Sequence, residues 1–252
     1  SHILDSNEVE IPFTHSTIHL PVLHIGPYDV SITKHDLMMW IAGLVLFVLL
    51  RLAVRRSDDP VPRGLHNALE LLILFIRDEV ARKSIPHGWE RYTGYLLTTF
   101  FFILSMNLLG LVPFMATPTG NISVTAALAV MAFFVIQVGG IREYGPIKHF
   151  ANLVPSGLPL WLTPLMFVLE LLSMFIKPFA LCIRLFANMM AGHVVILAFI
   201  SLIFILGIFT SPVAVGFALF VYFLEMLVAF IQAYIFTMLT AQFIGMSVHP
   251  AH

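Results

Sequence analysis

The length of the apolar segments constrains this chain more than any other feature. The segment from residue 164 to residue 208 is almost wholly apolar, and as a helix rising ~1.5 Å per residue it would measure roughly 68 Å. That is about twice the thickness of a hydrocarbon core, which is ~30 Å and takes roughly 20 apolar residues to cross. A lipid bilayer is therefore the environment in which this segment can bury its side chains.

Composition supports the same conclusion. Of the 252 residues, 59% are hydrophobic and only 11% are charged, and the mean hydropathy is +0.95. So little polar surface cannot cover a water-soluble globule of this size. The single cysteine, Cys182, excludes an internal disulfide and leaves the redox compartment undecided. We predict an all-α integral membrane protein with transmembrane helices at about residues 37–54, 95–115, 122–138, 164–208 and 213–244.

Basic residues set the expected orientation of these helices. Eight of the thirteen Lys and Arg residues lie between Arg51 and Arg91. Because loops rich in Lys and Arg stay on the cytoplasmic side, this loop is expected inside, or on the matrix side in an organelle. The loop 139–159 carries Arg142 and Lys148 and agrees with this assignment. The N-terminus is therefore expected outside and the C-terminus inside.

Two further segments are expected to lie outside the bilayer core. Residues 1–35 are polar and predict an extended arm on the outer side, although the absence of Met and of a signal-peptide pattern leaves the native start open. Residues 65–83 place apolar side chains at helical spacing on one face and charged side chains on the other. This pattern predicts an amphipathic helix at the membrane interface. In the arm, His15, His19 and His24 suggest a metal site, but their irregular spacing without Cys favours solvated or interface histidines. We therefore predict no metal.

The two C-terminal segments are expected to form a strongly tilted two-helix hairpin. Thr163-Pro164 is typical of an N-cap followed by proline at the first helical position. Pro178 could divide the segment into two spans, but no turn residues or charged loop follow it, so we favour one long tilted helix, kinked or straight. Thr210-Ser211-Pro212 supplies the turn to the last helix.

This hairpin contains polar side chains that lipid alone does not accommodate. A charge at mid-bilayer costs ~2.5–3.5 kcal/mol on insertion scales, so several charges on two helices indicate a water-filled crevice or a protein interface. Snorkelling or a structural hydrogen bond is an equal alternative for Lys177 and Asn188. For Arg184 we favour a functional role. The full set is Glu170, Lys177, Arg184, Asn188, His193, Glu225 and Gln232.

Spacing predicts how these side chains face one another. In an antiparallel hairpin that turns near residue 210, residues at equal distance from the turn lie side by side. The midpoint of His193 and Glu225 is residue 209, and that of Arg184 and Gln232 is residue 208. Arg184 shares one helical stripe with Glu170, Lys177 and Asn188, whereas His193 lies nine residues on, about half a turn round. We expect His193 and Glu225 to share a crevice, and Arg184 to face another element with Gln232 nearby.

The residue types then separate two chemical roles. Arginine keeps its proton, so Arg184 can act only as a fixed positive charge. Histidine and a carboxylate exchange protons near neutral pH in a suitable environment, so His193 and Glu225 can pass protons. A fixed cation beside a moving carboxylate forces the proton off it. The combination predicts a one-way barrier between two half-channels.

At these residues the chain resembles subunit a of the F-type ATP synthase, the stationary proton-channel subunit that abuts a rotating c-ring. The strongest part of the resemblance is Lys177-Pro178 followed by the segment from Arg184 to His193, which reads RLFANMMAGH. Residues 107–113 (NLLGLVP) and 232–236 (QAYIF) support it. The combination is specific, whereas any one piece alone would be weak.

The resemblance implies a role for each matching residue. Arg184 matches the essential arginine that separates the half-channels and interacts with the c-ring carboxylate, and Gln232 matches the glutamine beside it. His193 and Glu225 match a pair that some bacterial members carry in the opposite order. Asn188 matches a polar residue of the outer half-channel.

Three more positions complete the implied proton path. Glu170 and Ser173 match the inner, exit side. Asn107 is a family position as well, although a buried asparagine that joins helices is an equally good explanation. No phosphate-binding glycine-rich loop is present, which agrees with nucleotide chemistry on other subunits and with a subunit that has no cofactor and is not itself catalytic.

The function implied is proton translocation against the c-ring, coupled to ATP synthesis, with the c-ring, peripheral stalk subunit b and other synthase subunits as partners. The membrane implied is a bacterial inner membrane, with the mitochondrial inner membrane as the alternative. A stand-alone transporter or anion channel that uses Arg184 as substrate counter-ion is the second hypothesis, and a structural membrane scaffold the third. The sequence does not choose between H⁺ and Na⁺.

Overall fold

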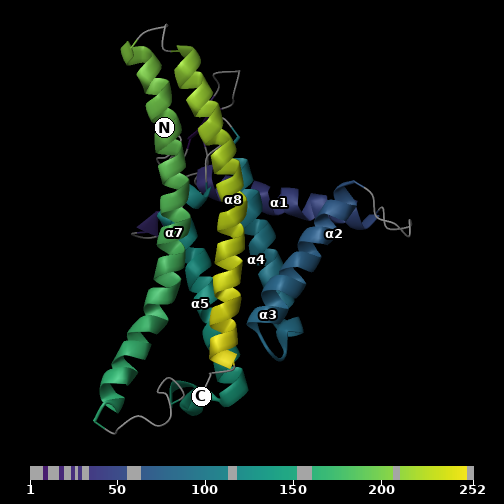
Figure 1. The fold of residues 1–252 in the computed structure, drawn as a ribbon, viewed down its shortest axis with the longest axis vertical. Coiled ribbons are helices and arrows are strands. Elements are labelled where there is room, and N and C mark those ends of the chain that lie inside the picture. The colour runs from purple at the N-terminus through teal and green to yellow at the C-terminus, as the bar shows by residue number, and fades with distance from the viewer. Residues whose placement is uncertain are drawn as a thin grey trace. The chain divides into compact units, whose positions relative to one another are not determined.

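A computed structural model describes residues 8–10, 17–19, 24–25, 28–29, 34–55, 64–112, 118–151, 161–206 and 211–248. Long helices dominate it (Figure 1), and four of them are long and apolar enough to cross a membrane: Trp89–Gly110, Ile122–Tyr144, Thr163–Phe199 and Pro212–Val248. The prediction of an all-α membrane protein is thereby confirmed. The first helix, α1 (Lys34–Arg55), contains a shorter apolar stretch, His35–Val48, so its role as a span remains a prediction.

The N-terminal arm contains short strands that the sequence did not indicate. β1 (Glu8–Glu10) pairs antiparallel with β2 (Thr17–His19), with Val9 opposite Ile18. β3 (His24–Ile25) pairs antiparallel with β4 (Tyr28–Asp29). His15 lies outside the described residues.

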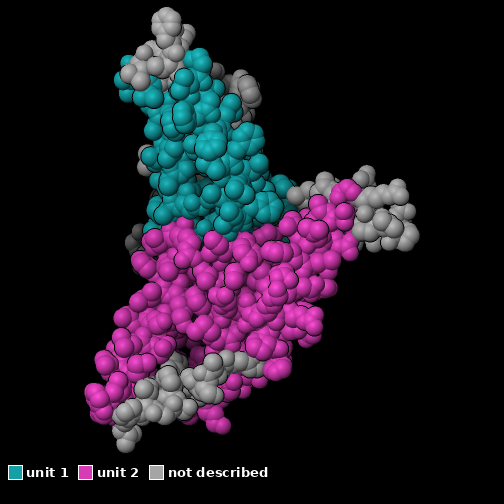
Figure 2. Space-filling view, viewed as in Figure 1, with its two compact units in different colours: residues 1–52, 101–124, 185–233 teal, residues 53–100, 125–184, 234–252 magenta. Residues whose placement is uncertain are grey.

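The chain divides into two compact units, which Figure 2 colours separately. Unit 1 comprises residues 1–52, 101–124 and 185–233, and unit 2 comprises residues 53–100, 125–184 and 234–252. Five of the described helices contribute residues to both units: α1, α4 (Trp89–Gly110), α5 (Ile122–Tyr144), α7 (Thr163–Leu206) and α8 (Ser211–Val248). In unit 1 the short helix η2 (Pro118–Gly120) follows α4.

In unit 2 the predicted amphipathic segment is a helix, but it is not uniform. α2 (Leu65–Phe75) passes into a π-helical stretch, η1 (Ile76–Ala81), before α3 (Arg82–Ser84). Ile76, Val80 and Ala81 are fully buried. The α3 end comes so close to α8 that a Cβ atom on Gly245 would lie 2.1 Å from the carbonyl oxygen of Ser84.

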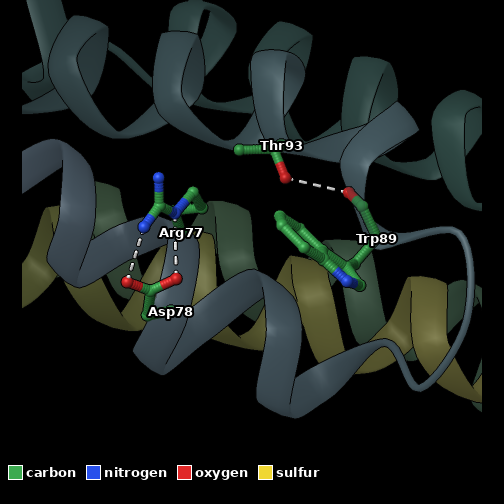
Figure 3. Close-up of polar contacts among 4 residues, drawn as sticks. All are labelled: Arg77, Asp78, Trp89 and Thr93. Atoms are coloured by element: carbon green, nitrogen blue, oxygen red, sulfur yellow. Dashed lines mark hydrogen bonds and ion pairs between the residues drawn. The ribbon is translucent and has the colours of Figure 1, made fainter.

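The polar side of this segment is held by local ion pairs. Nε and Nη2 of Arg77 donate to Oδ1 and Oδ2 of Asp78, each at 2.9 Å; Figure 3 shows both bonds. The Arg77 guanidinium accordingly lowers the pKa of the Asp78 carboxyl. Lys83 pairs with Glu79 one turn earlier. At the start of α4, the Thr93 hydroxyl donates to the backbone oxygen of Trp89 at 2.9 Å (Figure 3).

α5 (Ile122–Tyr144) extends beyond its predicted end and stops at a glycine. Gly145 adopts a φ of +79°, and its N–H donates to the Ile141 carbonyl at 2.8 Å. A left-handed residue at this place terminates a helix, and glycine adopts it without steric cost. Pro146 then begins the short helix α6 (Pro146–Ala151).

α6 places His149 against α5 within unit 2. The His149 ring lies 2.9 Å from the amide oxygen of Gln137 and packs on Gly140, where a Cβ atom would lie 2.4 Å away. The side chain is 7% exposed, and burial lowers the pKa of His149.

α7 is one continuous helix from Thr163 to Leu206, with Pro178 inside it. The single long helix favoured from the sequence is therefore observed. Its N-terminal part contacts α5 in unit 2, where the rings of Phe133 and Phe175 stack at 5.6 Å. The tilt of α7 to the bilayer remains a prediction.

Candidate functional site

Two facing contacts fix the antiparallel register of α7 and α8 within unit 1. The rings of Phe199 and Phe217 stack with centroids 5.6 Å apart and planes 8° apart. Nδ1 of His193 lies 3.7 Å from Oε1 of Glu225. The midpoints of these pairs are residues 208 and 209, so the register predicted from sequence spacing is confirmed. Figure 1 shows these parts of the two helices side by side.

The histidine and the carboxylate lie inside the hairpin. The side chains of His193 and Glu225 are 20% and 11% exposed. Their separation of 3.7 Å suits an electrostatic pair and exceeds that of a direct hydrogen bond. Among the described residues, none donates a hydrogen bond to either Glu225 carboxylate oxygen. A buried carboxylate without such bonds is costly, so a hydrogen-bond donor that reaches Glu225 would stabilise it.

Gly192 determines how close Glu225 comes to α7. A Cβ atom at this position would lie 1.8 Å from Oε1, 2.6 Å from Cδ and 2.8 Å from Cγ of Glu225. Only a glycine leaves room for the carboxylate in this position. The sequence pattern predicted no role for Gly192, and the signal present was the general preference for small residues where membrane helices meet.

A small pocket adjoins the carboxylate, and all its lining residues belong to unit 1. It has room for about one water molecule. Predicted site residues from three helices meet here, since α4 supplies Asn107, α7 supplies Asn188, and α8 supplies Glu225 and Gln232. The apolar part of the wall is Leu185, Met189, Val228 and Ala229.

Asn107 joins α4 to α8 at this pocket. Its Nδ2 donates to the backbone oxygen of Ala229 at 3.3 Å, and the side chain is 2% exposed. The interhelical role considered from the sequence is thus observed. The Oδ1 atom is buried and accepts no hydrogen bond from the described residues.

Arg184 differs in its surroundings from the other polar residues of the hairpin. It is exposed on α7, whereas Leu185 beside it is 1% exposed and Gln232 is 5% exposed. Asn188, predicted on the Arg184 stripe, lies at the edge of that stripe and lines the pocket with Glu225. The face of α7 that meets α8 therefore lies between the predicted stripe and His193, and it includes Asn188.

The two residues assigned to an exit path lie elsewhere on α7. Glu170 and Ser173 are half-buried in the unit 2 part of the helix and do not line the pocket. At ~1.5 Å per residue, Glu170 lies roughly 21 Å from Arg184 along the helix. Between them, Lys177 places its ammonium 5.4 Å from the centre of the Phe243 ring. This cation–π contact keeps a positive charge within the apolar helix pair.

No group of three or more His, Cys, Asp or Glu side chains able to hold a metal ion occurs among the described residues. The absence of a metal site in the arm remains a prediction, and His15 lies outside the described residues. The described site contains a buried carboxylate with a histidine beside it, three amides and an exposed arginine, groups that exchange protons or form hydrogen bonds.

Comparison with known proteins shows the family to which the chain belongs. The ATP synthase A chain family matches residues 36–245. The chain is 47% identical over 259 residues to ATP synthase subunit a of Chloroherpeton thalassium, covering 100% of this chain and 77% of the relative. It is 50% identical over 237 residues to ATP synthase subunit a of Myxococcus xanthus, covering 92% of this chain and 78% of the relative. The chain belongs to the ATP synthase subunit a family and is a component of the membrane sector of an F-type ATP synthase.

Proposed function

We propose that this subunit carries protons through two offset half-channels against a rotating c-ring, and so couples the proton motive force to ATP synthesis. The observation that carries the proposal is a contrast in burial. Glu225 lies inside the hairpin beside His193, whereas Arg184 lies exposed on the surface of α7. One site is suited to passing protons within the chain, and the other to meeting a partner outside it.

On the outer side, protons pass the His193 and Glu225 pair and then the amides of Asn188, Asn107 and Gln232. Neutral imidazole and an ionised carboxylate both accept a proton, so the pair can exchange one. The protons then load a carboxylate on subunit c. The amide side chains do not ionise, so they contribute by donating and accepting hydrogen bonds along the path.

On the inner side, Arg184 prevents direct passage between the half-channels. Its guanidinium stays charged, so it cannot relay a proton, and it favours the ionised form of a carboxylate that comes near. The proton released there leaves toward Ser173 and Glu170. The membrane potential supplies ~2.3 kcal/mol per charge per 100 mV, so several protons must combine for one ATP.

The proposed partners are the c-ring, peripheral stalk subunit b and the remaining synthase subunits, in a bacterial inner membrane. This chain then performs no catalysis itself. A stand-alone transporter would work when reconstituted alone, whereas this subunit should be inert without its ring. Membership of the ATP synthase family favours a subunit that is inert without its ring.

Arg184→Ala tests the proposal in membrane vesicles that contain the whole complex. We expect ATP-driven proton pumping to fall to background, because no other fixed charge replaces the guanidinium. The matched control is Arg142→Ala, which removes an exposed arginine from the last turn of α5 and should leave pumping intact. Unimpaired pumping by Arg184→Ala would refute the proposal.

The double variant His193→Ala with Glu225→Ala tests the outer path. Passive proton flow through the membrane sector should slow, since the exchanging pair is gone. Normal flow would remove both residues from the path and leave the role of Arg184 untouched.

A further inference from the structure

α5 contacts α7 at two places within unit 2. Nearer the N-terminus of α7, the rings of Phe133 and Phe175 stack at 5.6 Å. Further along, the hydroxyl oxygen of Thr125 lies 3.5 Å from Sγ of Cys182, as in a weak hydrogen bond to sulfur, and both side chains are buried. From the first contact to the second, α7 advances by seven residues while α5 runs back by eight. Both contacts therefore belong to one antiparallel helix pair.

Pro178 lies between these two contacts, where α7 lacks one of its own hydrogen bonds. Proline has no N–H, so it donates no bond to the Met174 carbonyl one turn earlier. Helices bend most often at such prolines, and neighbouring helices stabilise these places in membrane proteins. Phe175 before Pro178 and Cys182 after it are seven residues apart, so they share one face of α7. Through that face α5 supports α7 on both sides of Pro178.

Arg184 lies on the other side of α7 from the Cys182 contact. It follows Cys182 by two residues, which is about 200° round a helix of ~3.6 residues per turn. Because Cys182 faces Thr125 of α5, Arg184 is directed away from α5, and it is exposed there. A rotation of α7 about its axis would therefore move Arg184 out of this direction.

We infer that Thr125 and Cys182 are positioning residues for Arg184, because their contact fixes the rotation of α7 just beyond Pro178. The inference rests on the proposed function, in which Arg184 meets the ring and blocks direct proton passage between the half-channels. Without the contact, this part of α7 turns more freely and Arg184 is misdirected part of the time. Protons then cross between the half-channels without travelling on the ring.

The test measures proton leak through the intact ATP synthase in vesicles, after a carbodiimide has blocked the ring carboxylates. The remaining flow bypasses the ring, and it is expressed per assembled complex. Thr125→Val and Cys182→Ala each remove one partner of the contact. Each should raise the leak roughly two- to tenfold, the population equivalent of one net hydrogen bond. Thr125→Ser keeps the hydroxyl and should leak no more than the parent.

The matched control is Thr240→Val, which also removes a buried hydroxyl in unit 2. The Thr240 hydroxyl donates to the Phe236 carbonyl of its own helix at 2.8 Å. The variant therefore loses a hydrogen bond without releasing α7, and its leak should stay at the parental level. A contact that served stability alone would change the amount of assembled complex and leave the leak per complex unchanged.

The outcomes separate this inference from the proposed function. A raised leak in Thr125→Val and in Cys182→Ala, with no further rise in the double variant, supports the inference, since both changes remove the same contact. A parental leak in either variant, or an equal rise in Thr240→Val, would overturn it. If Arg184→Ala still abolishes ATP-driven pumping in that case, the proposed function stands without the positioning contact.

Discussion

Gly192→Ala is the substitution whose effect the structure specifies most closely. The added methyl carbon would lie 1.8 Å from Oε1 of Glu225, and ordinary contact begins near 3.4 Å. The difference between the two distances is 1.6 Å, and the carboxylate must retreat by about that much. The retreat is large beside the 3.7 Å that separates Glu225 from His193. The variant therefore displaces the carboxylate without removing any charged group.

The size of the effect follows from the crowding. Adding a methyl group to a packed site typically destabilises it by ~1–3 kcal/mol. Of this free energy, ~0.5–1.5 kcal/mol would come from turning the Glu225 side chain out of its preferred rotamer. If a cost near 1.4 kcal/mol falls on each proton that reaches Glu225, proton flow drops about tenfold. The subunit itself should assemble, because the end of a flexible side chain gives way more easily than backbone.

The assay is passive proton flow through the membrane sector, measured in vesicles after removal of the nucleotide-binding part. Gly216→Ala is the matched control, since no atom lies within 4 Å of a Cβ at that position. Both changes gain the ~0.8–1.0 kcal/mol by which alanine favours a helix over glycine, so only crowding distinguishes them. Glu225→Asp in the Gly192→Ala background shortens the acid by one methylene and should restore part of the flow. Equal flow in Gly192→Ala and Gly216→Ala would refute the reasoning.

Three further predictions concern unit 2. Gly245→Ala should lower thermal stability by ~1–3 kcal/mol, because its Cβ would meet the Ser84 backbone oxygen at 2.1 Å; an unchanged melting temperature of the purified complex would contradict this. Burial lowers the pKa of His149 in the folded protein, so below the ordinary pKa of 6.5 the unfolded chain binds more protons than the folded chain does. Stability should therefore decline as the pH falls below 6.5, and His149→Asn should flatten that decline in melting curves recorded across pH. The pKa of Asp78 is lowered by Arg77, so their pair stabilises above the ordinary value of 3.8 and is lost in acid; Asp78→Asn should differ slightly from the parent near neutral pH and not at all once both are acidified.

Much of the fold could be predicted because it depends on length and apolarity. A helix of 44 residues through Pro178 follows from an apolar run with no turn residues. The π-helical stretch Ile76–Ala81 could not be predicted, because one extra residue in a turn hardly changes a periodic pattern. Its position depends on packing, since three of its residues are fully buried.

The part of the site on α7 and α8 could be predicted from residue spacing, whereas Asn107 of α4 could be assigned to it only through the family resemblance. The register of His193 and Glu225 follows from counting residues on either side of one turn. Asn107 and Ala229 are 122 residues apart in the sequence, so local residue spacing could not predict their contact. Gly192 gave no signal of its own, because its role is to lack a side chain where Glu225 needs space.

The site combines an enclosed carboxylate, Glu225, with an exposed cation, Arg184. In the proposed function, the carboxylate that exchanges protons is Glu225, which the third helix, α4, and the close-packed Gly192 help to enclose. The fixed charge that the proposed function assigns to a contact with another protein is Arg184, which is exposed on α7, the helix that also carries Gly192 and His193. On α7, Arg184 and His193 are nine residues apart, about half a helical turn in direction and roughly 14 Å in height. In the proposed function, α7 thus supplies His193 to the buried pair with Glu225 and presents Arg184 to the partner.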